Sequence, residues 1–155
     1  MRASESDPLT GDWSFEPLLR KYLRIKQPLR ILEWGPGIST KIMVEEIPFV
    51  QVYTIEHDTL WANKWRAEFP PNVQLFEIPL GAGYIQAPLY WNMWFDMIFV
   101  DGERNTRNQC LEVASHLLSK GGVVLLHDSD WEEYAPGKAL FSVVEENQRT
   151  AVMMK

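Results

Sequence analysis

The chain has 155 residues, of which 46% are hydrophobic and 23% charged, a composition typical of one folded domain and not of a disordered chain. Its formal net charge of -6 at pH 7 disfavours nucleic acid and anionic membrane as partners, because both would be repelled. The single cysteine, Cys110, excludes an internal disulfide, and no apolar run approaches the roughly 20 residues that span a bilayer. We therefore expect a soluble, cytoplasmic protein that binds small molecules or proteins and no membrane.

Residues 1–12 are polar and contain a proline and a glycine, so we expect a flexible N-terminal arm, followed by a single domain over residues 13–155. An amphipathic helix is predicted first, because apolar residues recur at helical spacing from Phe15 to Leu23. Its basic residues are interpreted as a solvated face.

The stretch RILEWGPGIST, residues 30–40, joins a short apolar run to a glycine-rich turn. The apolar run predicts a buried strand of a parallel sheet, and Gly35-Pro36-Gly37 ends that strand. A helix is expected to begin at Ser39 and Thr40, so that backbone N–H groups and the positive end of the helix dipole face the turn. Because glycines let a ligand approach the backbone, this turn is a candidate cofactor site. A plain surface turn that ends a strand explains the same residues equally well.

A carboxylate, Glu33, lies two residues before the first glycine of this turn. A dinucleotide-binding G-x-G-x-x-G turn needs a third small residue where Thr40 stands, so the match to that pattern is partial. Open α/β sheets bind ligands at the carboxyl ends of their strands, and a carboxylate there repels pyrophosphate and attracts a cation. The turn therefore favours a cationic ligand.

Strand-like and helix-like segments alternate along the rest of the chain. Strands are expected at Gln51–Ile55, Val73–Ile78, Phe95–Val100 and Val123–Leu126. Helices are expected after the glycine-rich turn, after the cap Asp58 and around Cys110, the last of these ending at Lys120-Gly121-Gly122. A final helix is expected at about Lys138 to Asn147, followed by a short apolar run at Ala151–Met154. The alternation predicts a three-layer, Rossmann-like α/β sandwich with a mainly parallel sheet.

Ionisable residues follow several of these strands. Glu56 and His57 follow the second strand, and the Glu56 carboxylate could accept hydrogen bonds from both hydroxyls of a ribose or could simply cap the strand end. Asp101 follows the fourth strand, and His127 and Asp128 follow the fifth, so these groups are expected at one edge of the sheet.

The segment from Pro79 to Trp94 interrupts the alternation with two glycines, two prolines and several large aromatic residues. Its aromatic side chains either fold over an adenine or an apolar substrate or pack beneath the loop itself.

Four motifs, E-W-G-P-G-I-S-T, Y-T-I-E-H-D, F-D-M-I-F-V-D-G and G-G-V-V-L-L-H-D-S, together resemble the class I S-adenosylmethionine-dependent methyltransferases. The resemblance covers residues 29–134 and is most similar to small uncharacterised members with a V-D-G…R…C helix and an L-L-H-D strand end. It implies that Gly35 and Gly37 lie under the methionine part of S-adenosylmethionine, that Glu33 orders its amino group and that Glu56 binds its ribose. The implied cofactor-binding residues are Glu33, Gly35, Pro36, Gly37, Ser39, Thr40, Glu56, His57 and Asp101.

The resemblance also implies a catalytic group formed by Asp101, His127 and Asp128. Catechol-type and some macrolide O-methyltransferases hold Mg²⁺ where Asp101 and Asp128 stand, and such an ion would lower the pKa of a substrate hydroxyl and orient it. His127 could instead act as the general base. Ser129 stands where the catechol pattern has an amide ligand, so the sequence departs from that pattern at one metal ligand. The alternative is that these groups are ordinary strand-end residues.

These observations predict methyl transfer from S-adenosylmethionine to a small-molecule acceptor, most readily to an oxygen. A non-catalytic S-adenosylmethionine-binding module is the first alternative, and an NAD-dependent oxidoreductase is a weaker one because of Glu33 and Thr40. The fold of this family ends in a seventh, antiparallel strand, whereas this sequence is expected to be shortened near the sixth. An open sheet edge at Ala151–Met154 would then favour a homodimer.

Overall fold

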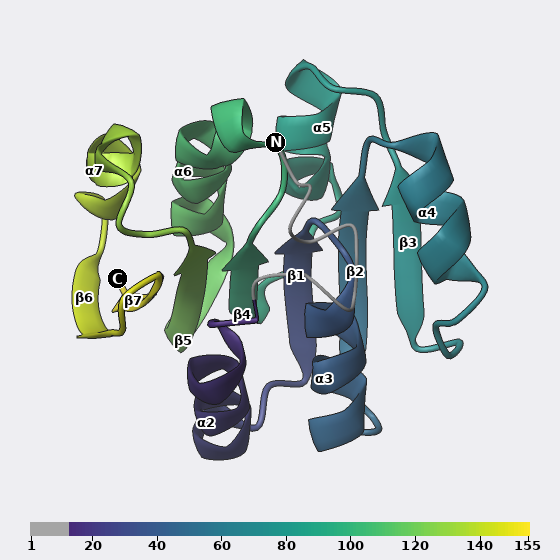
Figure 1. Cartoon of the computed structure of the whole chain (residues 1–155), viewed down its shortest axis with the longest axis horizontal. Coiled ribbons are helices and arrows are strands. Elements are labelled where there is room, and N and C mark those ends of the chain that lie inside the picture. Colours follow the sequence, from purple (N-terminus) through teal and green to yellow (C-terminus); the bar gives the residue numbers. More distant parts are fainter. Residues whose placement is uncertain (1–12) are drawn as a thin grey trace.

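The apolar runs of the sequence form a seven-stranded sheet (Figure 1), which a computed structural model describes over residues 13–155. The sheet has the order β3-β2-β1-β4-β5-β7-β6, in which the first five strands are parallel and β7 is antiparallel to both of its neighbours. The strands are β1 (Arg30–Trp34), β2 (Gln51–Glu56), β3 (Val73–Glu77), β4 (Phe95–Val100), β5 (Leu118–His127), β6 (Ser142–Glu146) and β7 (Thr150–Met154). The predicted arm, residues 1–12, lies outside the described residues.

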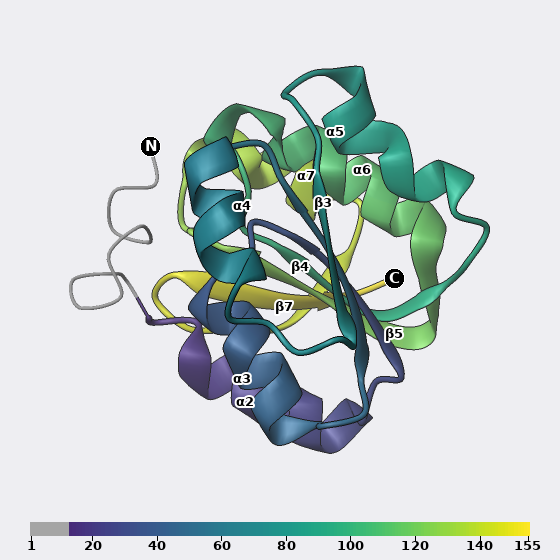
Figure 2. The same cartoon turned by 90° about the vertical axis from the view of Figure 1, so that its right-hand side faces the viewer.

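Helices cover both faces of the sheet, as the two perpendicular views show (Figures 1 and 2). One face carries α2 (Glu16–Lys26), α3 (Ile38–Glu46) and α4 (Thr59–Arg66). The other face carries α5 (Ala82–Gln86), α6 (Arg107–Leu117) and α7 (Ala135–Lys138). Short 3-10 turns lie at η1 (Ala87–Tyr90), η2 (Arg104–Thr106) and η3 (Glu132–Tyr134). This is the predicted three-layer α/β sandwich, and none of the helices over residues 13–155 has the length and apolarity that a bilayer span requires.

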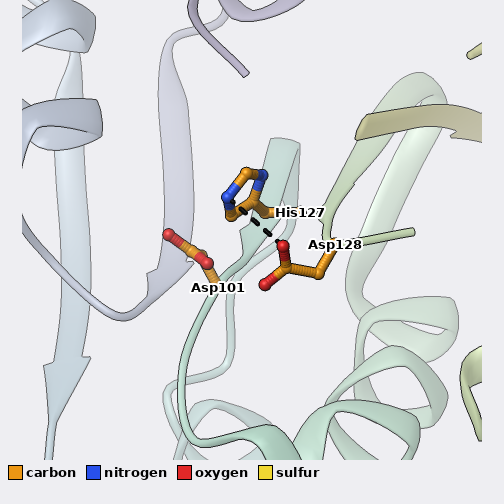
Figure 3. A group of neighbouring side chains, drawn as sticks. All are labelled: Asp101, His127 and Asp128. Atoms are coloured by element: carbon orange, nitrogen blue, oxygen red, sulfur yellow. Dashed lines mark ion pairs between the residues drawn. The ribbon is translucent and has the colours of Figure 1, made fainter. Parts of the chain in front are cut away.

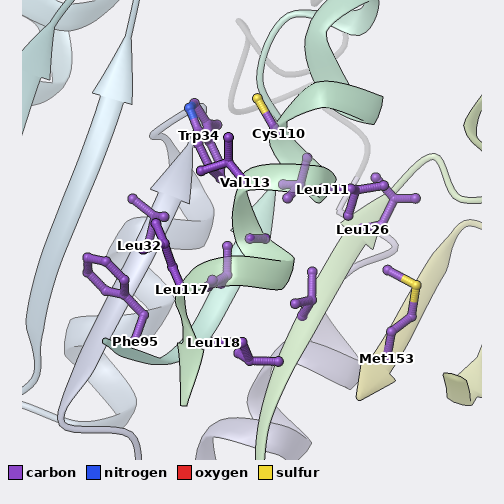
Figure 4. Close-up of a cluster of buried hydrophobic side chains, with 14 of the residues drawn as sticks. Leu32, Trp34, Phe95, Cys110, Leu111, Val113, Leu117, Leu118, Leu126 and Met153 are labelled. Carbon is purple, nitrogen blue, oxygen red and sulfur yellow. The ribbon is translucent and has the colours of Figure 1, made fainter. Parts of the chain in front are cut away.

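The central strands are apolar on both faces because each face packs against helices. In β5, for example, Val124 and Leu126 join the core beneath α6, whereas Val123 and Leu125 join the core beneath α2 and α3. Figure 4 shows the first of these cores, to which α6 contributes Leu111 among other residues. Because Leu111 is fully buried, its truncation to alanine is expected to cost about 2–5 kcal/mol of stability.

The C-terminal part of the chain differs from the prediction in a way that completes the sheet. The helix expected at about Lys138 to Asn147 is wrong, because α7 ends at Lys138 and β6 follows as a strand. The side chain of Asn147 accepts hydrogen bonds from the backbone N–H groups of Arg149 and Thr150 at 2.9 and 2.7 Å, which closes a tight turn between β6 and β7. This hairpin, held to the sheet by the non-local pairing of β7 with β5, overrides the weak helical pattern of the segment.

The expected shortening near a sixth strand is therefore wrong, since the seventh strand is present. β7 pairs with β5 on one side and with β6 on the other, so the segment Ala151–Met154 is not an open edge. The open edge on which the predicted homodimer rested is thus absent at this segment, because its backbone groups already face neighbouring strands of the same chain.

The boundary between α6 and β5 also differs from the sequence prediction. The helix ends at Leu117 and the strand begins at Leu118, so Lys120, Gly121 and Gly122 lie within the strand and not at a helix stop. A Cβ on Gly122 would lie 2.8 Å from the backbone oxygen of Asp96 in β4. The close approach of two strands explains at least this glycine.

Candidate functional site

Acidic side chains meet at the carboxyl edge of four adjacent parallel strands. Glu33 lies in β1, Glu56 is the last residue of β2, Asp101 follows β4 and Asp128 follows β5, and these strands lie side by side in the order β2-β1-β4-β5. All four residues are buried, with exposed fractions between 0% and 6%. Buried carboxylates without compensation are costly, so each must be held by donors or charges that the fold provides.

Glu33 is held by three hydroxyl groups. Ser39 Oγ and Thr40 Oγ1 each donate to its carboxylate at 2.5 Å, and Thr54 Oγ1 donates at 2.9 Å. Thr40 Oγ1 also accepts a hydrogen bond from the backbone N–H of Gly37 at 3.1 Å. The carboxylate therefore connects the end of β1 to the first turn of α3 and fixes the shape of the glycine-rich turn between them.

The glycine-rich turn is shaped by contacts within the chain as well as by any ligand. Gly35 has a φ of +92°, and a Cβ at this position would lie 2.3 Å from the backbone oxygen of Asp101. The glycine is thus required by the close approach of the ends of β1 and β4, whereas the sequence suggested only approach of a ligand. The carbonyl of Pro36 accepts a hydrogen bond from Trp61 Nε1 at 2.7 Å, and no sequence pattern indicated this contact with α4.

Glu56 and His57 lie at the end of β2, as the sequence predicted from the strand pattern. One oxygen of Glu56 accepts the backbone N–H groups of His57 and Asp58, both at 2.9 Å, and lies 3.2 Å from His57 Nδ1. The Asp58 side chain accepts from Trp61 N at 2.9 Å and caps α4, which confirms the predicted cap. These contacts fix the orientation of the Glu56 carboxylate.

In the aromatic loop between β3 and β4, some of the aromatic side chains pack beneath the loop and others are exposed. Tyr84 is fully buried, its ring lies 5.8 Å from that of His57, and its hydroxyl accepts from Glu103 N at 3.2 Å. Trp91 packs on Phe76 with ring centroids 4.6 Å apart. In contrast, Tyr90 is 82% exposed and Trp94 is 61% exposed.

Asp101, His127 and Asp128 form one cluster where β4 and β5 end (Figure 3). One potential ligand atom from each residue lies within 4.8 Å of the others, and His127 Nε2 lies 3.7 Å from Asp128 Oδ1. The His127 ring packs edge-on against Phe15, and its Nδ1 lies 3.4 Å from Thr150 Oγ1. Asp128 has a φ of +56°, an uncommon conformation for a residue other than glycine that clusters at functional sites.

Two arginines contact the carboxylates of this cluster. Arg107, the first residue of α6, lies 3.4 Å from Asp101 Oδ1 and 3.3 Å from Asp128 Oδ2 and is only 3% exposed. Arg149, in the turn before β7, pairs with Asp128 Oδ1. The sequence contained Arg107 within the V-D-G…R…C motif but did not reveal its partners, and Arg149 was missed entirely. Since two guanidinium groups already balance two carboxylates, these residues do not fit a divalent cation.

Burial changes the ionisation of two groups near this cluster. Burial raises the pKa of Tyr134 to about 12, so the phenol whose ring lies 5.6 Å from the Arg107 guanidinium stays neutral at physiological pH. Burial likewise raises the pKa of Cys110 to about 12, so this thiol is no candidate nucleophile.

A groove of about 690 Å³ opens beside Ser129, the residue that follows Asp128. The residues that line it are Ser129, Asp130, Trp131, Glu132, Ala135, Lys138, Ala139, Glu146, Asn147 and Gln148. The hydroxyl of Ser129 donates to Glu146 Oε2 at 2.8 Å, and Lys138 Nζ donates to the same oxygen at 2.9 Å. The size of the groove is that of a small-molecule site.

The fold recurs in solved structures of methyltransferases. An O-methyltransferase from Bacillus cereus in complex with S-adenosylhomocysteine matches with a TM-score of 0.70 and 16% identity over 99% of this chain and 86% of that one. The S-adenosylhomocysteine-bound methyltransferase PaMTH1 of Podospora anserina matches with a TM-score of 0.66 and 17% identity over 88% of this chain and 75% of that one.

A third solved structure combines this fold with a metal ion. The MycE methyltransferase of the mycinamycin pathway, in complex with Mg, S-adenosylhomocysteine and mycinamycin VI, matches with a TM-score of 0.66 and 16% identity over 91% of this chain and 45% of that one. No family model matches the chain, and no curated protein matches its sequence. The comparisons show that this chain has the Rossmann-like fold of the class I O-methyltransferases.

Proposed function

We propose that this chain is a cytoplasmic S-adenosylmethionine-dependent methyltransferase that methylates an oxygen of a small-molecule acceptor. The observation that carries the proposal is the set of buried carboxylates at the carboxyl edge of β2, β1 and β4, around a glycine-rich turn, in a fold shared with O-methyltransferases. An acidic site of this kind suits a ligand that carries an ammonium and a sulfonium and disfavours a dinucleotide pyrophosphate.

The proposed cofactor site uses the predicted residues in two ways. Glu56 is the residue proposed to bind the ribose hydroxyls, because two backbone N–H groups hold its carboxylate at the end of β2. Glu33 acts on the cofactor through the turn, since Ser39 and Thr40 occupy its carboxylate. Gly35, Pro36 and Gly37 form the wall of the site, and His57 and Asp101 flank it.

The bound cofactor would supply an electrophilic methyl group on a sulfonium. The acceptor is proposed to enter through the groove beyond Asp128, where Trp131 offers an aromatic wall. The acceptor hydroxyl must lose its proton as its oxygen gains the methyl group, and we assign that proton to His127, which Asp128 flanks at 3.7 Å. Asp101 and Asp128 then orient the reacting groups, and no step requires a metal.

Calorimetric titration of the purified chain tests this proposal first. S-adenosylmethionine and S-adenosylhomocysteine are expected to bind and NAD is not, and Glu56→Ala is expected to weaken binding of the first two by at least about tenfold, the effect of losing a buried hydrogen-bonded partner. Preference for NAD would refute the proposal. Tight cofactor binding with no conversion to S-adenosylhomocysteine across a broad panel of hydroxylated acceptors would point to a non-catalytic binding module.

A further inference from the structure

We propose that the guanidinium of Arg107 takes the place of a divalent cation between Asp101 and Asp128, so that this chain binds no metal at the cluster. The inference would make the proposed methyl transfer metal-independent. It rests on the contacts of the cluster, and its tests measure metal binding, so failure of this inference and failure of the proposed function can be told apart.

Arg107 is fixed from several directions at the place where a cation would have to lie. Its Nη2 lies 3.4 Å from Asp101 Oδ1 and its Nη1 lies 3.3 Å from Asp128 Oδ2. Its Nε donates to the carbonyl of Gly102 at 3.0 Å, and its Nη1 donates to the carbonyl of His127 at 2.9 Å. The side chain therefore joins the segments that follow β4 and β5, and its planar fork matches this pair of acceptors and carboxylates.

The guanidinium cannot leave this position without cost. Arg107 is 3% exposed, and the ring of Tyr134 covers it at 5.6 Å. If the side chain moved away, the carbonyls of Gly102 and His127 would each lose a donor inside the protein. A metal that displaced Arg107 would have to offset those losses.

Within residues 13–155, each carboxylate of the cluster already lies against a guanidinium group. Asp101 and Asp128 contribute two negative charges, and Arg107 and Arg149, which contact them, contribute two positive charges. A cation bound at about 2.0–2.1 Å from the same carboxylate oxygens, as Mg²⁺ requires, would lie next to the guanidinium nitrogens and be repelled by them. Burial strengthens this repulsion, because water screens little of it.

The third position of a metal site is also committed to another contact. Ser129 stands where the catechol pattern has an amide ligand, and its hydroxyl donates to Glu146 Oε2 at 2.8 Å. Lys138 Nζ adds a positive charge 2.9 Å from that same oxygen. The Ser129 hydroxyl is therefore already hydrogen-bonded to Glu146 and is not available as an oxygen ligand for a hard cation.

Binding of Mn²⁺, a spectroscopic substitute for Mg²⁺, tests the proposal directly. Free Mn²⁺ is measured by electron paramagnetic resonance while the full chain is titrated with the ion up to about 1 mM, the range of weak protein sites for divalent cations. With wild type, the signal of free Mn²⁺ is expected to equal that of the same Mn²⁺ concentration in buffer without protein. Binding of one Mn²⁺ per chain that is lost in Asp128→Asn would overturn the proposal.

A matched set of variants tests whether Arg107 is the cause. Arg107→Met is expected to bind one Mn²⁺ at least about tenfold more tightly than wild type, because removal of the Arg107 guanidinium leaves two buried carboxylates with only the charge of Arg149 against them. Mn²⁺ should also raise the melting temperature of Arg107→Met and not that of wild type. Arg107→Lys retains the positive charge and is expected to exclude the ion.

Arg104→Met serves as the control, since Arg104 precedes α6 by a few residues and pairs with Glu133 at the surface. It should bind no Mn²⁺. A folded Arg107→Met variant that gains no Mn²⁺ site would contradict the proposal, and if that variant does not fold, the wild-type titration with Asp128→Asn still decides it.

Discussion

Gly35 is the position at which one added methyl group tests how the site is built. A Cβ there would lie 2.3 Å from the carbonyl oxygen and 2.7 Å from the carbonyl carbon of Asp101. Neither backbone segment can move freely, because Gly35 N donates to the carbonyl of Ile55 and Asp101 N donates to the carbonyl of Trp34, both at 3.0 Å. Gly35→Ala is therefore expected to separate the ends of β1 and β4.

The loss of stability in Gly35→Ala has two parts, a backbone penalty and a steric penalty, and a matched control separates them. Gly121 has a similar φ of +80°, but a Cβ there would meet nothing within 4 Å. Gly121→Ala should thus cost only the left-handed backbone penalty, about 1–2 kcal/mol. Gly35→Ala adds an overpacking penalty of about 1–3 kcal/mol, which gives a total of about 2–5 kcal/mol.

Urea unfolding followed by tryptophan fluorescence measures both free energies, and the seven tryptophans provide the signal. A parallel titration with S-adenosylhomocysteine should show weaker binding for Gly35→Ala and unchanged binding for Gly121→Ala. Equal losses of stability in the two variants would refute the reasoning, because they would show that the carbonyl of Asp101 does not limit the space at Gly35.

Three further predictions concern the acceptor site, the carboxylate beside the proposed proton acceptor His127 and the contact between two helices. Ala139→Trp should fill the groove and raise the KM for an acceptor, while the affinity for S-adenosylhomocysteine measured by calorimetry stays unchanged. A KM equal to that of wild type would show that the acceptor binds elsewhere. Asp128→Asn should retain cofactor affinity and lower kcat by about 10²–10⁴-fold, and a kcat like that of wild type would remove Asp128 from the mechanism. Hydrogen bonds from Arg24, and next from Arg20, hold the pKa of Glu46 below its ordinary value of 4.5. Its contribution to stability should therefore be complete above pH 4.5 and fall as pH drops through the lower folded pKa, and urea unfolding of Glu46→Gln should show a smaller loss over that range.

The sequence predicted the elements whose signal is local. Apolar runs bounded by turn residues marked the strands from β1 to β4, and the cap Asp58 and the helical spacing after Phe15 marked α4 and α2. The prediction was wrong for β6, because the pairing of Val143 with Met153 in a hairpin outweighs the local pattern. Tertiary pairing overrides propensity most easily in such short segments.

The sequence also predicted which acidic residues of the candidate site lie together, because this depends on where the predicted strands end. Parallel strands bring the residues at their carboxyl ends to one edge, so the order of the motifs alone indicated that Glu33, Glu56, Asp101 and Asp128 would share it. The sequence by itself thus determined the fold class and which acidic groups lie together. Only the tertiary structure decided what surrounds them, because the partners of each carboxylate come from distant segments. Arg107 and Arg149 are separated from Asp128 by 21 residues each. Their convergence on one carboxylate depends on helix and hairpin packing, and no local pattern encodes it.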